Sequence, residues 1–183
     1  MCKEKEILPK IIKLRNYMIN KSLKFRKEAQ PSDLEAVRKI AESTGFFYPD
    51  EVDVAVELVE ERLQKGDASD YYFVFAEIEN KVVAYTCFGP IPVTKGSFDL
   101  YWIITHNDFR GLGIGKKLLT ETYIDAKKLG ARAIYAETSG REKYEPTRQF
   151  YLKTNYTVDA VQKDFYDVGD DKYVFKYALT GEN

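Results

Sequence analysis

Cysteine and histidine are scarce in this chain, and their scarcity limits the chemistry to be expected of it. The 183 residues include two cysteines, Cys2 and Cys87, and one histidine, His106. Cys2 stands in an expected tail and Cys87 in an apolar strand, so we expect no structural disulfide. A lone histidine without a cysteine cluster also argues against a zinc-type site, and we expect no bound metal.

Two further absences concern charge of one sign and long apolar runs. The chain has 28 basic and 29 acidic residues and a net charge of −1, so nothing predicts non-specific binding to nucleic acid. No apolar run is long enough to span a membrane. Lys and Glu interrupt the apolar stretches near the N-terminus, which argues against a signal peptide. We therefore expect a cytoplasmic protein without a membrane partner.

The apolar residues that are present suffice for one folded domain. Hydrophobic residues make up 44% of the chain and aromatic residues 14%, a composition typical of globular proteins. A length of 183 residues suits a single core. We place the domain at residues 23–183. Residues 1–22 read as a basic, partly helical extension that packs on the domain or on a second copy, and in the latter case the protein is a homodimer.

The most informative segment is Arg110-Gly111-Leu112-Gly113-Ile114-Gly115-Lys116. Three alternate glycines precede a helical pattern, which exposes backbone N–H groups at a helix N-terminus, where the dipole favours an anion. Glycine also lets the backbone approach a phosphate closely. The spacing excludes two common phosphate loops: a Walker A loop needs glycine at Arg110, and a dinucleotide fingerprint needs it at Lys116 or Leu118.

The segments on both sides of this loop predict a strand, a helix and a second strand. Aromatic and β-branched residues from Phe98 to Thr105 indicate a strand. Apolar residues recur at helical spacing from Leu118 to Leu129, and Gly130 ends the helix. Ala131 to Thr138 reads as the next strand. This order is that of a βαβ-like unit.

The remaining elements follow from periodicity and turn signals. We expect a strand at 23–28, helices from Asp33 to Gly45 and from about Asp50 to Lys65, a hairpin of 72–78 and 82–88, a helix carrying Phe150 and Tyr151, and strands near 157–163 and 172–179. The acidic segment 164–171 is expected to connect the last two strands.

Two blocks of the sequence resemble the GCN5-related N-acetyltransferase (GNAT) family. The glycine loop is similar to the acetyl-CoA motif of the family, Arg/Gln-x-x-Gly-x-Gly/Ala, and the block from Thr147 to Tyr156 resembles its Phe-Tyr helix and the turn after it. Asn155 replaces the usual glycine of that turn, and asparagine also enters the left-handed region. Tyr144 stands where many members have an asparagine that contacts the cofactor.

The resemblance implies a fold of the α/β (α+β) class, the GNAT fold. This fold is a mixed, mostly antiparallel central sheet of six to seven strands flanked by helices, with strands 4 and 5 splayed apart. It also implies an N-acetyltransferase that uses acetyl-CoA as cosubstrate and transfers the acetyl group to a primary amine by direct attack on the thioester. The implied acetyl-CoA-binding residues are Ile103, Ile104, Thr105, Arg110, Gly111, Leu112, Gly113, Ile114, Gly115 and Lys116.

Two residues are expected to carry the proton transfers of this reaction. An amine is mostly protonated at neutral pH, so a carboxylate should accept its proton directly or through water. Glu137 is the first choice and Asp99 the second. Tyr151 resembles the family tyrosine that faces the CoA sulfur, with Phe150 pointing into the core. Because a phenol is a weaker acid than a thiol by about 1.5 pKa units, Tyr151 is expected to act chiefly as a hydrogen-bond donor.

The sequence leaves open both the identity of the acceptor and the class of function. Candidate rim residues are Phe46, Phe47, Tyr48, Phe165 and Tyr166. The acceptor is either a peptide or protein N-terminal amine, as in the ribosomal-protein alanine acetyltransferase type, or a small amine, and the acidic segment 164–171 would attract a cation. A non-catalytic acyl-CoA-binding regulatory module is the alternative function, and a nucleotide-binding protein is a third hypothesis.

Overall fold

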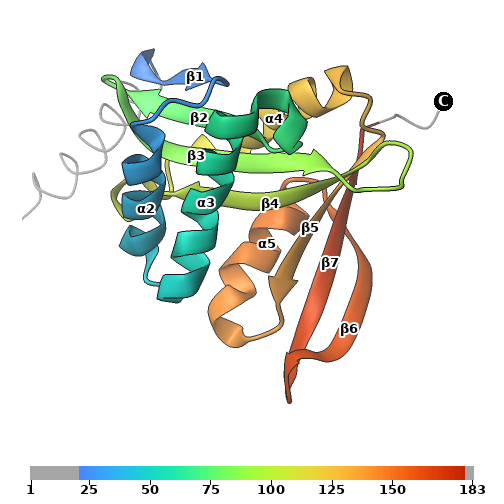
Figure 1. Cartoon of the computed structure of the whole chain (residues 1–183). Helices are drawn as coiled ribbons and strands as arrows, with labels where there is room; N and C mark the ends of the chain where they lie inside the picture. The colour runs from blue at the N-terminus through green and yellow to red at the C-terminus, as the bar shows by residue number, and fades with distance from the viewer. Residues whose placement is uncertain (1–20, 180–183) are drawn as a thin grey trace, which may run out of the picture.

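The computed structural model describes residues 21–179 and has one seven-stranded sheet (Figure 1). The strands are β1 (Lys24–Arg26), β2 (Tyr72–Ile78), β3 (Lys81–Pro90), β4 (Ser97–Thr105), β5 (Ala133–Ser139), β6 (Thr157–Asp167) and β7 (Asp170–Ala178). The helices are α2 (Asp33–Thr44), α3 (Pro49–Lys65), α4 (Ile114–Lys128) and α5 (Glu145–Lys153), with short 3₁₀ helices η1 (Gly66–Ser69), η2 (Asn107–Phe109) and η3 (Glu142–Tyr144). Cys2 and residues 1–20 of the expected extension at 1–22 lie outside the described residues.

The strand order is β1-β2-β3-β4-β5-β7-β6, and every neighbouring pair is antiparallel except β4 and β5. The predicted mixed, mostly antiparallel sheet of six to seven strands is therefore confirmed. Within residues 21–179, no helix combines the length and apolar character needed to cross a membrane.

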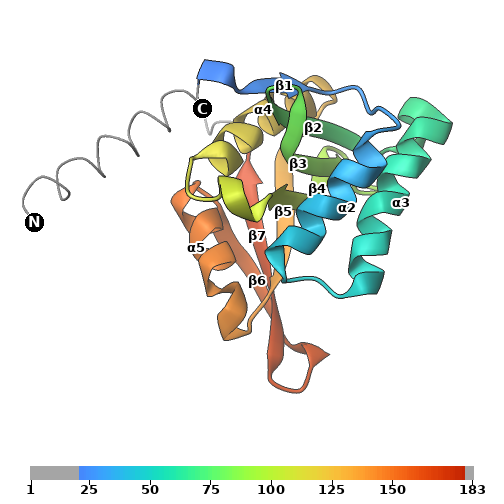
Figure 2. The same cartoon turned by 90° about the vertical axis from the view of Figure 1, so that its left-hand side faces the viewer.

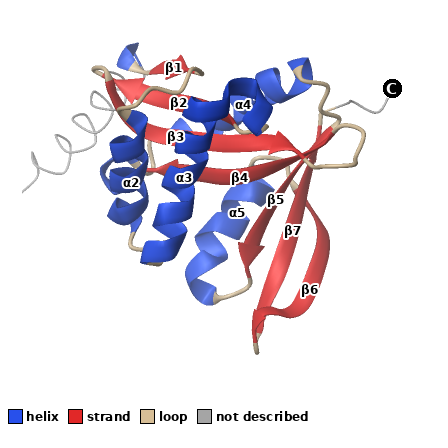
Figure 3. Ribbon diagram, viewed as in Figure 1, coloured by secondary structure: helices blue, strands red, loops and turns tan. Residues whose placement is uncertain are grey.

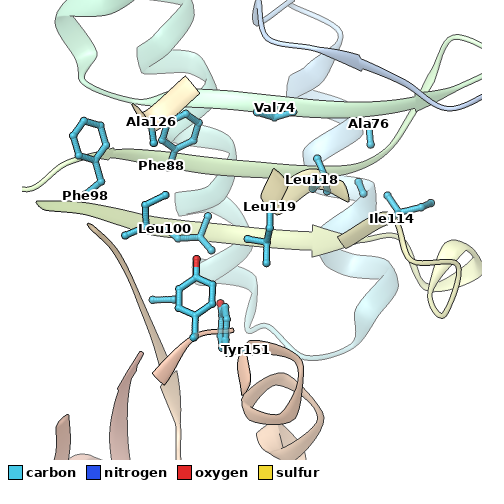
Figure 4. Close-up of a cluster of buried hydrophobic side chains, with 14 of the residues drawn as sticks. Val74, Ala76, Phe88, Phe98, Leu100, Ile114, Leu118, Leu119, Ala126 and Tyr151 are labelled. Atoms are coloured by element: carbon cyan, nitrogen blue, oxygen red, sulfur yellow. The ribbon is translucent and has the colours of Figure 1, made fainter. Parts of the chain in front are cut away.

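Two apolar cores cover the two faces of the sheet, so β2 and β3 are buried on both sides. On β2, Val74 and Ala76 face one core and Phe73 and Phe75 the other, as the period of two along a strand requires. Helices α2 and α3 pack on the second face (Figure 2). Figure 4 shows the first core, where side chains of α4 lie over the sheet and Tyr151 of α5 joins them.

Strands β4 and β5 separate after a short contact (Figure 3). They pair only where Ser97–Asp99 meets Ala133–Tyr135, so the predicted splay is confirmed. Between β3 and β4 the register shifts: Cys87 opposes Trp102 and Phe88 opposes Leu100, leaving Tyr101 as an extra residue. An extra residue of this kind is a β-bulge, which bends its strand. The bulge therefore lies where β4 turns away from β5.

The predicted acidic connection at 164–171 is wrong in its extent. β6 continues to Asp167 and β7 begins at Asp170, so the turn is formed by Val168 and Gly169, the latter with φ 80°. The aspartates stabilise the hairpin: Asp164 accepts the Gly169 N–H at 2.6 Å, and Asp171 accepts the Asp164 N–H at 3.1 Å. These local hydrogen bonds override the low strand propensity of aspartate.

The turn after α5 confirms the expected role of Asn155. Its φ is 69°, in the left-handed region that asparagine tolerates better than most residues. The turn leads directly into β6 and leaves Tyr156 buried beside Tyr151, with ring centroids 5.1 Å apart. The first predicted strand is shorter than expected, since only Lys24–Arg26 pairs with β2.

Candidate functional site

A cavity of about 850 Å³ opens where β4 and β5 separate. It is lined from the end of β4, the glycine loop and first turn of α4, the end of β5, helix α5, the α2–α3 connection and the tip of the β6–β7 hairpin. Ligand cavities of small-molecule enzymes fall in this range of volume. All of the sequence-predicted site residues except Asp99, Leu112 and Phe165 line it, although they come from segments far apart in the chain.

The glycine loop has the geometry of an anion site. Gly111 and Gly113 both have φ of 75°, where a side chain is strained, and Gly113 is the N-cap of α4. No acidic residue stands in the first turn of the helix. The first N–H groups of an α-helix have no partner within the helix, and they attract an anion. The loop can therefore hold a phosphate at the mouth of the cavity.

Gly115 shows a second reason for glycine in this loop. A Cβ at this position would lie 3.3 Å from the ring of Phe150 on α5, which is a tight contact. Arg110 and Lys116 line the cavity with the glycines, and the Arg110 guanidinium lies 5.6 Å from the Phe46 ring centre. Leu112 differs from the prediction: it is half-buried against the first core and does not line the cavity.

Beyond Asp99, the edge of β4 that turns away from β3 has no strand partner within residues 21–179 and faces the cavity. Ile103, Ile104 and Thr105 all line the cavity, and the His106 N–H donates to the carbonyl oxygen of Val83 on β3 at 2.8 Å. Because successive residues of a strand direct their backbone polar groups to alternate sides, the N–H groups of Ile103 and Thr105 point away from β3. These two donors can hold a carbonyl oxygen at the centre of the cavity.

Tyr151 lines the same cavity from α5 and is 4% exposed. Its ring packs on Tyr156 and Phe175, with centroid distances of 5.1 Å to each. Burial raises the pKa of the Tyr151 phenol well above its usual value, so the hydroxyl keeps its proton. The expected core position of Phe150 is only partly right, since its half-buried ring packs on the core and also lines the cavity.

The two candidate proton acceptors lie on neighbouring strands. Glu137 on β5 lines the cavity with its side chain 46% exposed, and its oxygens lie 3.1 Å from the Lys172 ammonium. Asp99 on β4 is half-buried and is not among the lining residues. Burial, and then the negative charge of Glu137, raises the pKa of Asp99 to about 6, and Lys172 opposes the shift. Its place in the cavity favours Glu137 as the proton acceptor. A pKa close to neutrality favours Asp99 for the same role.

Four of the five predicted rim aromatics line the cavity, namely Phe46, Phe47, Tyr48 and Tyr166. Phe165 does not, because its ring lies over the Lys172 ammonium at 3.9 Å. Sequence reasoning missed Tyr101, Trp102 and Tyr144 as members of this rim. Nothing in the alternation of β4 marks the bulge that turns Tyr101 and Trp102 toward the cavity. Across residues 21–179, no three His, Cys, Asp or Glu side chains gather in a way that could hold a metal ion.

Comparison with known proteins places these features in a family. The model of the acetyltransferase (GNAT) family matches residues 34–156. A solved structure from Desulfovibrio desulfuricans, assigned to the GNAT acetyltransferases, is 44% identical; the match covers 86% of this chain and 99% of that chain, with a TM-score of 0.85.

More distant structures share the fold. An aminoglycoside 6'-N-acetyltransferase solved with coenzyme A is 16% identical (TM-score 0.71, 88% of this chain and 98% of that one). The ribosomal-protein-S18-alanine N-acetyltransferase of Escherichia coli is 13% identical (TM-score 0.67, 88% and 96%). Among curated proteins, palmitoyltransferase AKR1 of Debaryomyces hansenii is 34% identical over 76 residues, 40% of this chain but only 9% of that protein. A match to so small a part of AKR1 does not bear on the activity of this chain.

Proposed function

The chain belongs to the acetyltransferase (GNAT) family, and we propose that it transfers the acetyl group of acetyl-CoA to a primary amine that attacks the thioester directly. One observation carries the proposal. A single cavity joins a glycine-capped helix N-terminus, an unpaired edge of β4, a buried tyrosine and a carboxylate. These are the parts that this reaction needs: a phosphate site, a carbonyl site, a proton donor and a proton acceptor.

The donor binds at the glycine loop in this proposal. The N–H groups from Gly111 to Lys116 hold the pyrophosphate, and Arg110 and Lys116 add positive charge to the same mouth. Lys153, at the end of α5, also lines the cavity. The pantetheine arm then runs into the gap between β4 and β5, where the N–H groups of Ile103 and Thr105 receive the thioester carbonyl.

The chemical step forms one bond and breaks one. The amine nitrogen attacks the carbonyl carbon, the new C–N bond forms, and the C–S bond breaks. The amine loses a proton to Glu137, directly or through water, and the departing sulfur accepts a hydrogen bond from the Tyr151 hydroxyl. The products are the N-acetylated amine and CoA as a free thiol, with the proton following to sulfur.

Thiol release from acetyl-CoA tests the proposal. The full chain is mixed with acetyl-CoA and a panel of small primary amines and of peptides with a free N-terminus, and free thiol is followed with a thiol-reactive dye. Mass spectrometry of the product should show one added acetyl group. Acetyl-CoA binding without turnover on any acceptor would instead support a non-catalytic acyl-CoA-binding module. Tight ATP binding without CoA binding would contradict both readings.

A further inference from the structure

Two carboxylates at the acceptor end of the cavity are paired with cations. Asp170 is 3% exposed; it accepts a hydrogen bond from Ser139 at 2.5 Å and pairs with Arg141 at 2.9 Å. Glu137 pairs with Lys172. The expected attraction of a cationic acceptor by the acidic hairpin is therefore weak, because its carboxylates already serve the hairpin and its neighbours.

The other charged groups of this end keep their charge, but each already has a hydrogen-bond partner in the backbone. Glu51 accepts the Tyr48 N–H at 2.7 Å, as an N-terminal helix cap. Lys143 donates to the carbonyl oxygen of Phe46 at 3.3 Å and lies 4.9 Å from the Tyr144 ring centre. Asp167 accepts the Val168 N–H at 2.8 Å. Four carboxylates (Glu51, Glu137, Asp167 and Asp170) therefore stand beside three cations (Arg141, Lys143 and Lys172), so neither sign of charge dominates this end as a site for a second charge on the acceptor.

Aromatic rings are the surface that remains. Tyr48, Tyr101 and Tyr166 are 61%, 37% and 48% exposed, and all three line the cavity. Exposed aromatic side chains that converge from separate segments on one cavity indicate a binding surface. They line the same cavity as the Glu137 carboxylate. Burial first, and the charge of Glu137 second, raises the pKa of Tyr166 to about 12. Burial and then Asp99 similarly raise the pKa of Tyr101 to about 12.

We infer that the acceptor is a small arylalkylamine: one primary amino group joined by a short chain to a flat, uncharged aromatic body. The inference rests on the proposed acetyltransferase function and concerns the acceptor half of the same cavity. The amino group lies at Glu137, and the body lies among Tyr48, Tyr101, Trp102, Tyr144 and Tyr166. Ring stacking holds the body, and the attacking nitrogen keeps the reaction already described.

Matched acceptors test the inference with the full chain. Phenethylamine and phenylalanine differ only by a carboxylate, and spermidine replaces the ring by further charges. We expect kcat/KM for phenethylamine and tryptamine to exceed that for phenylalanine and spermidine by at least about ten-fold. This ratio corresponds to a difference in transition-state binding of about the size of one hydrogen bond. A peptide with an N-terminal alanine should be acetylated no faster than phenylalanine.

Variants of the rim add a second readout. Tyr166→Ala should raise KM for phenethylamine several-fold with little change in kcat, and Tyr166→Phe, which keeps the ring, should restore it. Val168→Ala is the control, because Val168 is 92% exposed at the same hairpin and does not line the cavity. Preference for spermidine, phenylalanine or the peptide would overturn the inference and leave the acetyltransferase function standing. Acetyl-CoA binding without thiol release from any acceptor would contradict that function itself and the inference with it.

Discussion

Tyr151 combines two properties that are usually separate, a position in the core and a place on the cavity wall. Its ring is fixed by Tyr156 and Phe175, so the hydroxyl needs no ordering when the substrate binds. Burial raises the pKa of the phenol, which makes complete proton transfer to a thiolate less favourable than for an exposed tyrosine. Hydrogen-bond donation to the leaving sulfur is the role that this environment supports.

We expect Tyr151→Phe to lower kcat by about 10- to 100-fold, the loss of one hydrogen bond to a charged atom. The dissociation constant for acetyl-CoA should change little, because the ring and its packing remain. Thiol-release kinetics and calorimetric titration measure the two quantities. Tyr156→Phe is the matched control: Tyr156 belongs to the same aromatic cluster but does not line the cavity. Equal turnover in Tyr151→Phe and the parent would remove Tyr151 from the mechanism.

Two variants and a pH profile can show whether Glu137 or Asp99 is the proton acceptor. We expect Glu137→Gln to lower kcat/KM by about 100-fold or more, the lower range of general-base effects, while Asp99→Asn lowers it a few-fold. The pH profile provides the discriminating measurement. If Asp99 were the base, activity would rise as the pH rises through about 6, where Asp99 ionises, and Asp99→Asn would abolish that limb while Glu137→Gln retained it.

At the level of elements, the glycine loop shows why three glycines differ in function. Gly111 and Gly113 adopt positive φ, whereas Gly115 leaves room for the Phe150 ring. The loop thereby sets the start of α4 at Ile114 and exposes the first N–H groups of the helix to the cavity.

Gly113→Ala should affect stability and acetyl-CoA affinity together. The left-handed conformation costs a non-glycine residue about 1–2 kcal/mol, and relief of that strain would move the N–H groups that we propose bind phosphate. We expect a lower melting temperature and an acetyl-CoA dissociation constant at least about ten-fold higher. Gly130→Ala is the matched control. Gly130 has φ 90° at the other end of α4, with open space around it and no contact with the cavity. It should lose similar stability with unchanged affinity, and equal affinity losses in the two variants would contradict the assignment of the loop.

Elements with local signals could be predicted from the sequence, and elements shaped by distant partners could not. The helix that starts at Asp33 and ends at Gly45 has its signals within a few residues of each end. The bulge at Tyr101 depends on the register with β3, which no local pattern encodes. The extension of β6 to Asp167 depends on backbone N–H hydrogen bonds that the Asp164 and Asp171 carboxylates accept across the hairpin, so composition alone predicted a loop.

At the scale of the whole molecule, the site exists because one pair of strands separates. The three residue pairs between β4 and β5 hold the sheet together at one end, and the gap beyond them brings residues from 44 to 170 to one cavity. From residues alone, the loop predicted an anion site. Its assignment to acetyl-CoA, and the pairing of Tyr151 with Glu137, came from the resemblance to a family. The acceptor rim combines residues from four segments, and only the folded chain reveals which of them meet.

The same site leaves a signature in the pH dependence of global stability. Asp99 has a pKa of about 6 in the folded protein and about 3.9 when unfolded. The folded state therefore binds more protons between these values, and this carboxyl group makes the protein less stable as the pH rises from about 4 to about 6. Asp99→Asn has no charge at any pH, so it lacks this loss.

We expect Asp99→Asn to melt at the same temperature as the parent near pH 4 and at a higher temperature at pH 8. After allowance for solvent screening of a half-buried group, the gain is about 1 kcal/mol, or about 2–4 °C for a chain of this size. Calorimetry without substrate measures it. Asp171→Asn is the control of opposite sign. A hydrogen bond from Lys163 lowers the pKa of Asp171, so the stability this carboxylate contributes is lost as the pH falls. Its asparagine variant should be less stable than the parent at pH 8. A lower melting temperature for Asp99→Asn at pH 8 would show that the Asp99 carboxylate is stabilised in the fold, and it would remove the reason to place a proton on it near neutrality.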